Sequence, residues 1–388
     1  MRRRLAVVLG RNYVSRLGMI RAAGKSGCDV AVINTNRVSG KTEARIDASS
    51  RYVCGYNCCP QPDQAGLIAL LKSKYADPNN KPVILPTDDY SAATIDEYQE
   101  ELSKDFVLPG IAHRSGEVVK AMDKLLQKRI ARETGLCVAR GWKAEIKNGE
   151  YDIPDDVEFP CFVKPEISIR GSKYQMKKCG TRQELVDAVN RVREKSDANI
   201  LIEEYIEIEK ELAVLGVCLS GRCEMPAVLE TELAYLGVTG IGKAVSITVY
   251  PGLWESLERF IRAFDFDGLF DIDLFVSKGK VYFNELNLRY GANGYAVSLG
   301  VRNLPGLFIN GFTNETDSGQ TLNNFTPFTF MNEKVCHQLC TDGIMKWCDF
   351  YENLNEVRVT LVRSADDPKP YRHFREKVLL SRIKHLIK

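Results

Sequence analysis

The feature that most constrains the fold is an alternation, near the start of the chain, between short apolar runs and stretches with apolar residues at helical spacing. The runs are rich in Val, Ile and Leu, as strands buried on both faces of a parallel sheet tend to be. We therefore predict a Rossmann-like α/β domain over residues 1–112. Its predicted strands are Leu5–Leu9, Val30–Ile33 and Val83–Leu85, and its predicted helices are Arg16–Ala23 and Gln64–Tyr75.

Two loops follow predicted strands of this domain and are expected to face a ligand, because ligands gather beyond the carboxyl ends of such strands. They are Gly10–Asn12 and Pro86–Asp89. No Gly-x-Gly-x-x-Gly sequence follows the first strand, which removes the main support for a dinucleotide site. The segment Gly18–Ser26 resembles a P-loop, but its first spacing is one residue too long, and Gly24 and Gly27 look like the end of a helix.

The composition is that of a globular protein, with 44% hydrophobic and 27% charged residues. A formal charge of +2, from 53 basic and 51 acidic residues, gives no field that would gather nucleic acid or an anionic membrane. No run of about 18 apolar residues is present. The basic start and apolar run of Met1–Leu9 are better explained by a first strand than by a signal peptide. We therefore expect a cytoplasmic protein with no nucleic-acid or membrane partner.

The twelve cysteines are expected to be reduced thiols and not a disulfide framework, because they are spread through a long chain without a secretion signal. Two clusters, one within Cys54–Cys59 and one within Cys336–Cys348, are candidates for metal sites. Neither contains the Cys-x-x-Cys pair that structural zinc sites usually use. Buried free cysteine is the better explanation of both.

After the first domain the pattern changes to a mixture of antiparallel strands and single helices, which predicts an α+β pair of lobes. The predicted helices are Val118–Thr134, Arg182–Arg193 and Leu253–Phe264. The predicted strands are Cys161–Lys164, Tyr174–Lys177 and Ile200–Tyr205, an antiparallel block over Glu211–Val249 and a hairpin over Leu269–Leu288. The part beyond Phe312 is expected to be less regular and to end in a surface helix over Arg372–Lys388.

The hairpin is the segment most informative about chemistry. Alternate residues of a strand share a face, so Glu285, Asn287 and Arg289 point together. A carboxylate, an amide oxygen and a guanidinium side by side form a surface suited to Mg²⁺ and phosphate. A solvated hairpin face with an ordinary ion pair is the alternative.

Two further acids, Asp271 and Asp273, share one face of the preceding strand. A three-residue turn would bring that face to the side of Glu285, and a two-residue turn would place it opposite. The sequence leaves both arrangements open.

Three other segments favour a phosphate and nucleotide site. Lys164 lies among apolar residues of a predicted strand, where a lysine is costly unless it meets an anion. The loop Ser168–Lys173 supplies small and basic residues whose backbone N–H groups could close over phosphates. The strand Ile200–Ile206 can present backbone groups to an adenine edge, and Glu211 beyond it can accept hydrogen bonds from ribose hydroxyls.

The order and spacing of these segments resemble the ATP-grasp superfamily over about Ser115–Phe312, and the first domain is similar to the usual N-terminal partner of that family. The resemblance implies two lobes that close on ATP within an ATP-grasp domain of residues 113–312. The small lobe would span about 123–202 and the large lobe about 203–312. Residues 313–388 would be a C-terminal extension.

The resemblance also implies roles for individual residues. The residues implied at the ATP are Lys124 and Lys164 at the phosphates, Gly171 and Ser172 in the closing loop, Glu203, Glu204, Tyr205 and Ile206 at the adenine hinge, and Glu211 at the ribose. The implied ligands of two Mg²⁺ ions, with Mn²⁺ as an alternative, are Asp273, Glu285 and Asn287. Arg289 would steady the transferred phosphoryl and acyl groups. Two departures from the family pattern are the single glycine of the loop and Leu288, where a proline often stands.

The activity that the resemblance implies is that of a carboxylate–amine ligase, which makes an acyl phosphate from ATP and joins it to an amine. Arg289–Tyr295 and Asn303–Gly306 look similar to a D-aspartate-ligase-like, carbamoyl-phosphate-synthase-like branch, whose members join an amino acid to a cell-wall peptide or related acceptor. Lys243 and Arg302 are candidates for gripping a substrate carboxylate. A carboxylase that uses bicarbonate and an ATP-binding module without turnover are the alternatives, and a homodimer is a family expectation.

Overall fold

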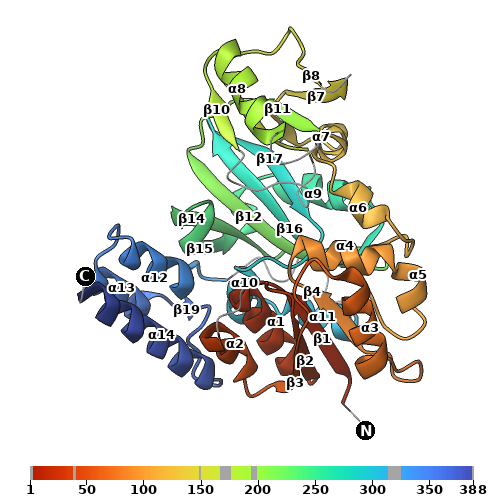
Figure 1. Cartoon of the computed structure of the whole chain (residues 1–388), viewed down its shortest axis with the longest axis vertical. Coiled ribbons are helices and arrows are strands. Elements are labelled where there is room, and N and C mark those ends of the chain that lie inside the picture. The colour runs from red at the N-terminus through yellow and green to blue at the C-terminus, as the bar shows by residue number, and fades with distance from the viewer. Residues whose placement is uncertain are drawn as a thin grey trace.

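Four parallel strands form the sheet of the N-terminal domain, in the order β3-β2-β1-β4 (Figure 1). The computed structural model describes residues 3–37, 41–147, 150–166, 176–193, 199–312 and 325–386. The predicted Rossmann-like domain is confirmed, with one further strand, β3, that the sequence pattern did not reveal. Its strands are β1 (Leu5–Gly10), β2 (Asp29–Asn34), β3 (Val53–Cys58) and β4 (Val83–Pro86), and its helices are α1 (Tyr13–Lys25), α2 (Lys41–Ala48), α3 (Gln64–Tyr75), α4 (Asp89–Glu97) and α5 (Gln99–Leu102).

Two helices of this domain begin directly beyond the carboxyl ends of strands. Asn12 follows β1 and caps α1 by accepting a hydrogen bond from the N–H of Val14. Asp88 follows β4 and caps α4 through the N–H of Ser91. These caps satisfy N–H groups that the first turn leaves free. The P-loop-like segment lies within and just after α1, as predicted.

A second sheet, in the order β10-β9-β11-β7-β8, forms the lobe at the top of Figure 1. Its strands are β7 (Gly141–Lys147), β8 (Glu150–Asp152), β9 (Cys161–Pro165), β10 (Lys177–Cys179) and β11 (Ile200–Glu204), covered by α8 (Arg182–Arg193). The long helix predicted before this lobe is two helices, α6 (Glu117–Ala121) and α7 (Lys124–Glu133). Asp123 separates them, because its carboxylate accepts the N–H groups of Leu125 and Leu126 and starts a new helix.

The large sheet joins the remaining strands in the order β19-β18-β15-β14-β12-β16-β17-β6, with β13 beside β12 and β5 beside β16. Helix α9 packs its buried Leu257, Phe260 and Ile261 on one face. Its strands are β5 (Gly110–Ile111), β6 (Cys137–Val138), β12 (Lys210–Leu219), β13 (Arg222–Glu224), β14 (Ala227–Tyr235), β15 (Val238–Ser246), β16 (Phe266–Ser277), β17 (Lys280–Asn287), β18 (Phe328–Met331) and β19 (Val359–Thr360). Its helices are η3 (Ile247–Val249), α9 (Leu253–Arg262), α10 (Gly294–Gly300) and α11 (Leu304–Asn310).

The C-terminal part is regular, which corrects the expectation of a less regular tail. Strands β18 and β19 extend the large sheet, and helices α12 (Glu333–Thr341), α13 (Trp347–Glu356) and α14 (Lys369–Leu386) lie beside the N-terminal domain (Figure 1). The buried guanidinium of Arg21 in α1 is paired with Asp367 at 2.9 Å. The sequence could not reveal this docking, because it depends on contacts between residues more than 300 positions apart.

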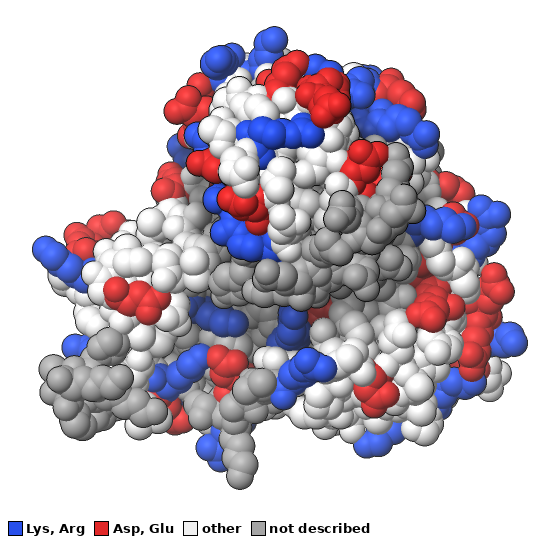
Figure 2. All heavy atoms as spheres, turned by 45° about the horizontal axis from the view of Figure 1, so that its top comes forward, with Lys and Arg blue, Asp and Glu red and all other residues white. Residues whose placement is uncertain are grey.

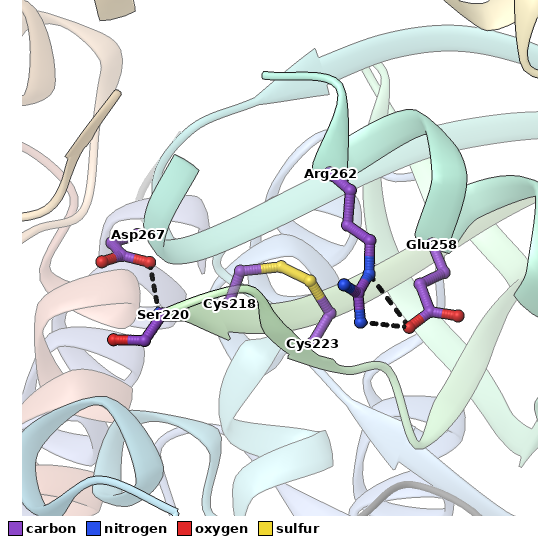
Figure 3. The surroundings of a disulfide bond; sticks show 6 residues. All are labelled: Cys218, Ser220, Cys223, Glu258, Arg262 and Asp267. Carbon is purple, nitrogen blue, oxygen red and sulfur yellow. Dashed lines mark hydrogen bonds and ion pairs between the residues drawn. A yellow bond between two sulfur atoms is a disulfide. The ribbon is translucent and has the colours of Figure 1, made fainter. Parts of the chain in front are cut away.

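One pair of cysteines departs from the prediction of free thiols. Cys218 at the end of β12 and Cys223 in β13 form a disulfide across the connecting turn (Figure 3). In the same turn the N–H of Ser220 donates to Asp267 Oδ1 at 2.7 Å. The other ten cysteines are free. The hairpin places the two thiols side by side, a proximity that spacing alone does not predict.

None of the helices in the described ranges has the length and hydropathy needed to cross a bilayer.

His337 in α12 makes the stability of the fold depend on pH. Its side chain is 6% exposed, among Trp347 and Phe374. Burial, with a smaller effect of Lys377, lowers the pKa of His337 from 6.5 to about 4. Between these values the unfolded chain binds a proton that the folded chain does not, so stability falls as pH falls. We expect His337 to lower the free energy of unfolding by about 2 kcal/mol at pH 5 relative to pH 8.

Urea unfolding of the wild type and of His337→Phe at both pH values measures this component. His337→Phe should lose this pH-dependent part of the free energy of unfolding. His373→Phe, at a more exposed position of α14, should keep it. An unchanged pH dependence in His337→Phe would assign the effect to another group.

Candidate active site

A β-bulge in the β16–β17 hairpin determines which side chains share a face. The turn between Ser277 and Lys280 has two residues. Continued without change, that register would pair Asp273 with Asn284 and turn Glu285 to the other face. Instead the ladder shifts by one residue, Asn284 is the extra residue, and Asp273 lies opposite Glu285. The bulge, and not a longer turn, therefore brings the two acids together.

The side chains of this row contact one another. Asn287 Nδ2 donates to Asp273 Oδ2 at 3.2 Å, and Arg289 Nη2 donates to Asn287 Oδ1 at 3.0 Å. Arg289 Nη1 lies 3.4 Å from Asp271 Oδ2. The chain beyond β17 passes close to this acid, because a Cβ on Gly291 would lie 1.9 Å from the same oxygen. A larger residue than glycine would therefore displace Asp271.

Arg289 also joins the large sheet to the N-terminal domain. Its Nε donates to Asp89 Oδ1 at 2.9 Å, and Asp89 begins α4 in the loop that the sequence predicts to face a ligand. Burial lowers the pKa of the Arg289 guanidinium, but Asp89 and Asp271 outweigh burial, and the pKa is raised above its ordinary value. Arg289 is therefore a permanent cation held by two acids from different domains.

Lysines from α7 and β9 approach the row from the side of the small lobe. Lys124 Nζ lies 3.1 Å from Glu285 Oε1. Lys128 and Lys164 both pair with Glu203, at 2.7 and 2.8 Å, and Lys164 Nζ also donates to Asn284 Oδ1 at 3.2 Å. The bulge residue thus connects the two lobes through Lys164.

Glu203 is a buried carboxylate that holds two lysines in place. Burial raises its pKa, but Lys164 and Lys128 outweigh burial and lower the pKa below its ordinary value. Burial also lowers the pKa of Lys128, with a further contribution from Lys164. A charged Glu203 therefore keeps two closely spaced cations together where the lobes meet.

The predicted adenine hinge is the connection from β11 to β12. The N–H of Glu204 donates to the carbonyl of Arg140, and the N–H of Tyr205 donates to the carbonyl of Pro160. Lys178 lies over the Tyr205 ring, 3.8 Å from its centroid. Within the described part of the chain, the N–H of Ile206 makes no hydrogen bond, so it is open to a ligand acceptor.

Glu211 and Lys243 lie on different faces of the large sheet, and only Glu211 shares the face of Asp273. Glu211 is exposed on β12, opposite Phe275 of β16. Along the ladders, Asp273 pairs with Ala213, Ala213 pairs with Leu229, and Leu229 pairs with Ala244. Paired residues share a face and neighbours alternate, so Lys243 points to the opposite face from Asp273.

The structure therefore does not place Lys243, the candidate for gripping a substrate carboxylate, on the face that carries Asp273. Its partner across the strands is Glu230. The other candidate for a substrate carboxylate, Arg302, pairs with the buried Glu224 at 3.3 Å. Gly171 and Ser172 of the predicted closing loop lie outside the described residues.

Two residues of the site were missed by sequence reasoning. Lys128 could have been found, because it follows Lys124 by four residues and so shares its helix face. Asn284 could not have been found, because its role depends on a β-bulge that no sequence motif predicts.

The oxygen donors of the row fit Mg²⁺. Asp273, Glu285 and Asn287 lie on adjacent strands, and Mg²⁺ in proteins is usually held by one or two carboxylates plus substrate phosphates. Among the described residues, no group of three or more His, Cys, Asp and Glu side chains could hold a metal ion. Burial, together with the nearby Asp89 and Glu285, outweighs Arg289 and raises the pKa of Asp271 to about 6. A divalent cation would relieve this crowding of negative charge.

Residues 136–297 match the family model described as the D-Ala–D-Ala ligase C-terminus. The large chain of carbamoyl phosphate synthase from Caldanaerobacter subterraneus is 29% identical over 203 residues, which is 49% of this chain and 18% of that one. The chain thus spans less than a fifth of this curated relative.

Two solved structures share the fold over most of the chain. L-amino acid ligase from Bacillus licheniformis has a TM-score of 0.63 and 13% identity, covering 85% of this chain and 79% of that one. N5-carboxyaminoimidazole synthetase from Staphylococcus aureus, complexed with ADP, has a TM-score of 0.63 and 16% identity, covering 90% and 86%. At these identities the likeness shows the fold alone.

Proposed function

We propose that this chain is an ATP-grasp enzyme, an ATP-dependent carboxylate–amine ligase that forms an amide or peptide bond through an acyl phosphate. One observation carries the proposal. The row of Asp273, Glu285 and Asn287 ends in Arg289 and lies next to lysines of the opposing lobe. Oxygen donors for a cation, a guanidinium and lysine ammonium groups are thus close together, as phosphoryl transfer requires.

ATP would bind between the small lobe and the large sheet. Lys164 and Lys124 would contact its phosphates, and Glu203 positions Lys164 from behind. The open N–H of Ile206 would meet the adenine edge, beside Glu204 and Tyr205. Glu211 on β12 would accept hydrogen bonds from the ribose. Gly171 and Ser172 are proposed to close over the phosphates.

Two Mg²⁺ ions would be held by Asp273, Glu285 and Asn287 together with the ATP phosphates. When bound, Mg²⁺ neutralises the charge that spreads over the transferred phosphoryl group. Glu285, which contacts Lys124 at 3.1 Å, would hold the cation, and the Lys124 ammonium would then be available to phosphate oxygens.

In the reaction, a carboxylate oxygen of the first substrate attacks the γ-phosphorus and ADP leaves. The amine of the second substrate then attacks the acyl carbon, loses a proton, and releases phosphate. Arg289 is suited to orient the acyl group and stabilise its oxygen, because Asp89 and Asp271 fix the guanidinium from two sides.

We propose an amino acid as one substrate, as in a D-aspartate-ligase-like enzyme. The family model of a D-Ala–D-Ala ligase and the fold of an L-amino acid ligase support this choice. Bicarbonate is the alternative carboxylate.

ADP release with Mg-ATP, measured against a panel of D- and L-amino acids, bicarbonate and amine acceptors, tests the function. We expect release only when both a carboxylate and an amine are present. Lys164→Met should raise the KM for ATP by about 10- to 100-fold, because it removes a charged contact to phosphate.

Lys177→Met is the matched control, because Lys177 lies in the same sheet but opposite Val163, on the other face from Lys164. It should leave the KM unchanged. Nucleotide binding without ADP release under any combination would indicate an ATP-binding module, and release with bicarbonate alone would indicate a carboxylase.

A further inference from the structure

Two basic side chains without acidic partners lie beyond the carboxyl end of β1. Lys334 of α12 is half-buried, and its Nζ donates to Asn12 Oδ1 at 3.2 Å. Arg11 precedes Asn12 and is exposed. Neither forms an ion pair with any carboxylate of the residues that the structure describes.

Two of the acids nearby already have basic partners. Glu43 pairs with Lys377, and Asp47 pairs with Arg16 at 2.5 Å. Burial lowers the pKa of Lys334, and Lys377, Arg16 and Arg11 lower it further against Glu43. Lys334 therefore lies in a positive environment that an anion would relieve.

Two helices also begin at this point. Asn12 caps α1, of 13 residues, and Lys334 lies in the first turn of α12, of nine residues. The N-terminus of a helix carries a partial positive charge and favours an anion. Cations without acidic partners and two helix N-termini thus coincide. Figure 2 shows where basic and acidic side chains lie on this face of the molecule.

This positive region adjoins the candidate active site through one loop. The N–H of Arg11 donates to Asp88 Oδ2 at 2.6 Å, and the next residue, Asp89, pairs with Arg289. A ligand that extends from Arg289 toward Lys334 would thus first meet the carboxylates of Asp88 and Asp89 and then the cations of the positive region. A ligand with an ammonium group near Arg289 and an anionic group near Lys334 would have the complementary order of charges.

We propose that Lys334 and Arg11 bind the carboxylate of the amine substrate, so that the acceptor is an amino acid or peptide with a free carboxylate and not a neutral amine. The inference rests on the proposed ligase activity. It gives the C-terminal segment, which lies outside the match to the family model, a part in substrate selection.

The test compares each acceptor with its carboxamide, for example glycylglycine with glycylglycinamide, in ADP release. The wild type should prefer the acid. Lys334→Met should lower kcat/KM for the acid by about 10- to 100-fold, the range for a lost contact to a charged group, and leave the amide unchanged. Lys334→Arg should retain the preference. Lys346→Met, an exposed lysine of the same segment, should match the wild type.

Equal loss for the acid and the amide in Lys334→Met, or no preference in the wild type, would overturn the proposal. A second measurement separates it from the proposed function. Succinate should raise the Tm of the wild type more than succinamide does, at constant ionic strength, and Lys334→Met should lose the difference. If ADP release fails with every substrate but this difference is present, the ligase activity is wrong and the anion site stands. If succinate stabilises both proteins equally, the anion site is wrong.

Discussion

Replacing Glu285 with glutamine is expected to lower the rate of substrate-dependent ADP release by about 10²–10³-fold, comparable to the loss of one group that stabilises the transition state. The change removes one negative charge from the row that faces the transferred phosphoryl group and keeps the shape of the side chain. Glu285 raises the pKa of Asp271 and also pairs with Lys124, so the relief of repulsion and the loss of that ion pair oppose each other, and the Tm should change little. Steady-state ADP release and thermal unfolding measure the two effects.

Glu255→Gln is the control for this variant. Glu255 is exposed on α9, which packs on the opposite face of the large sheet. The same chemical change there should alter neither activity nor Tm. A Glu285→Gln enzyme with wild-type activity would remove Glu285 from the proposed cation site, and a large fall in Tm would indicate a structural role.

Asp367→Ala is expected to lower the free energy of unfolding by about 3–5 kcal/mol, the usual cost of leaving a buried charge unpaired. Asp367 is 1% exposed, and its carboxylate accepts hydrogen bonds from Arg21, Ser50 and the N–H of Arg51. The variant would leave the guanidinium of Arg21 buried without its acid. Urea unfolding followed by circular dichroism measures the change.

The neighbouring acid gives a matched comparison. Asp366 is 41% exposed and pairs with Lys25 at 3.3 Å. Asp366→Ala should cost no more than about 1 kcal/mol, as exposed ion pairs do. Similar losses in the two variants would contradict the view that burial of the Arg21–Asp367 pair docks the C-terminal segment.

Much of the fold could be predicted from the sequence, because the relevant signals are local. The strand Leu5–Gly10 is marked by a run of buried apolar residues, and α8 begins and ends where helical spacing placed it. Because alternate residues of a strand share a face, the sequence of the strand Lys280–Asn287 correctly predicts that Glu285 and Asn287 point to the same side. Such periodicities arise within a few residues and need no knowledge of distant contacts.

The candidate site was predicted less completely, for a physical reason. Whether Asp273 faces Glu285 depends on one extra residue in a strand ladder, and a shift of one residue reverses every side chain. Lys243 illustrates the same limit, because its face is set by the register of four strands in succession.

The sequence by itself determined the classes of the domains, the ATP-grasp resemblance and the residue types of the site. Only the tertiary structure decided that Asn284 forms the bulge, that Glu203 holds two lysines, and that the C-terminal segment docks through Arg21. These features depend on which residues, distant in sequence, come together in the interior. There, every buried charge and hydrogen-bonding group needs a partner. Local patterns do not encode those partners.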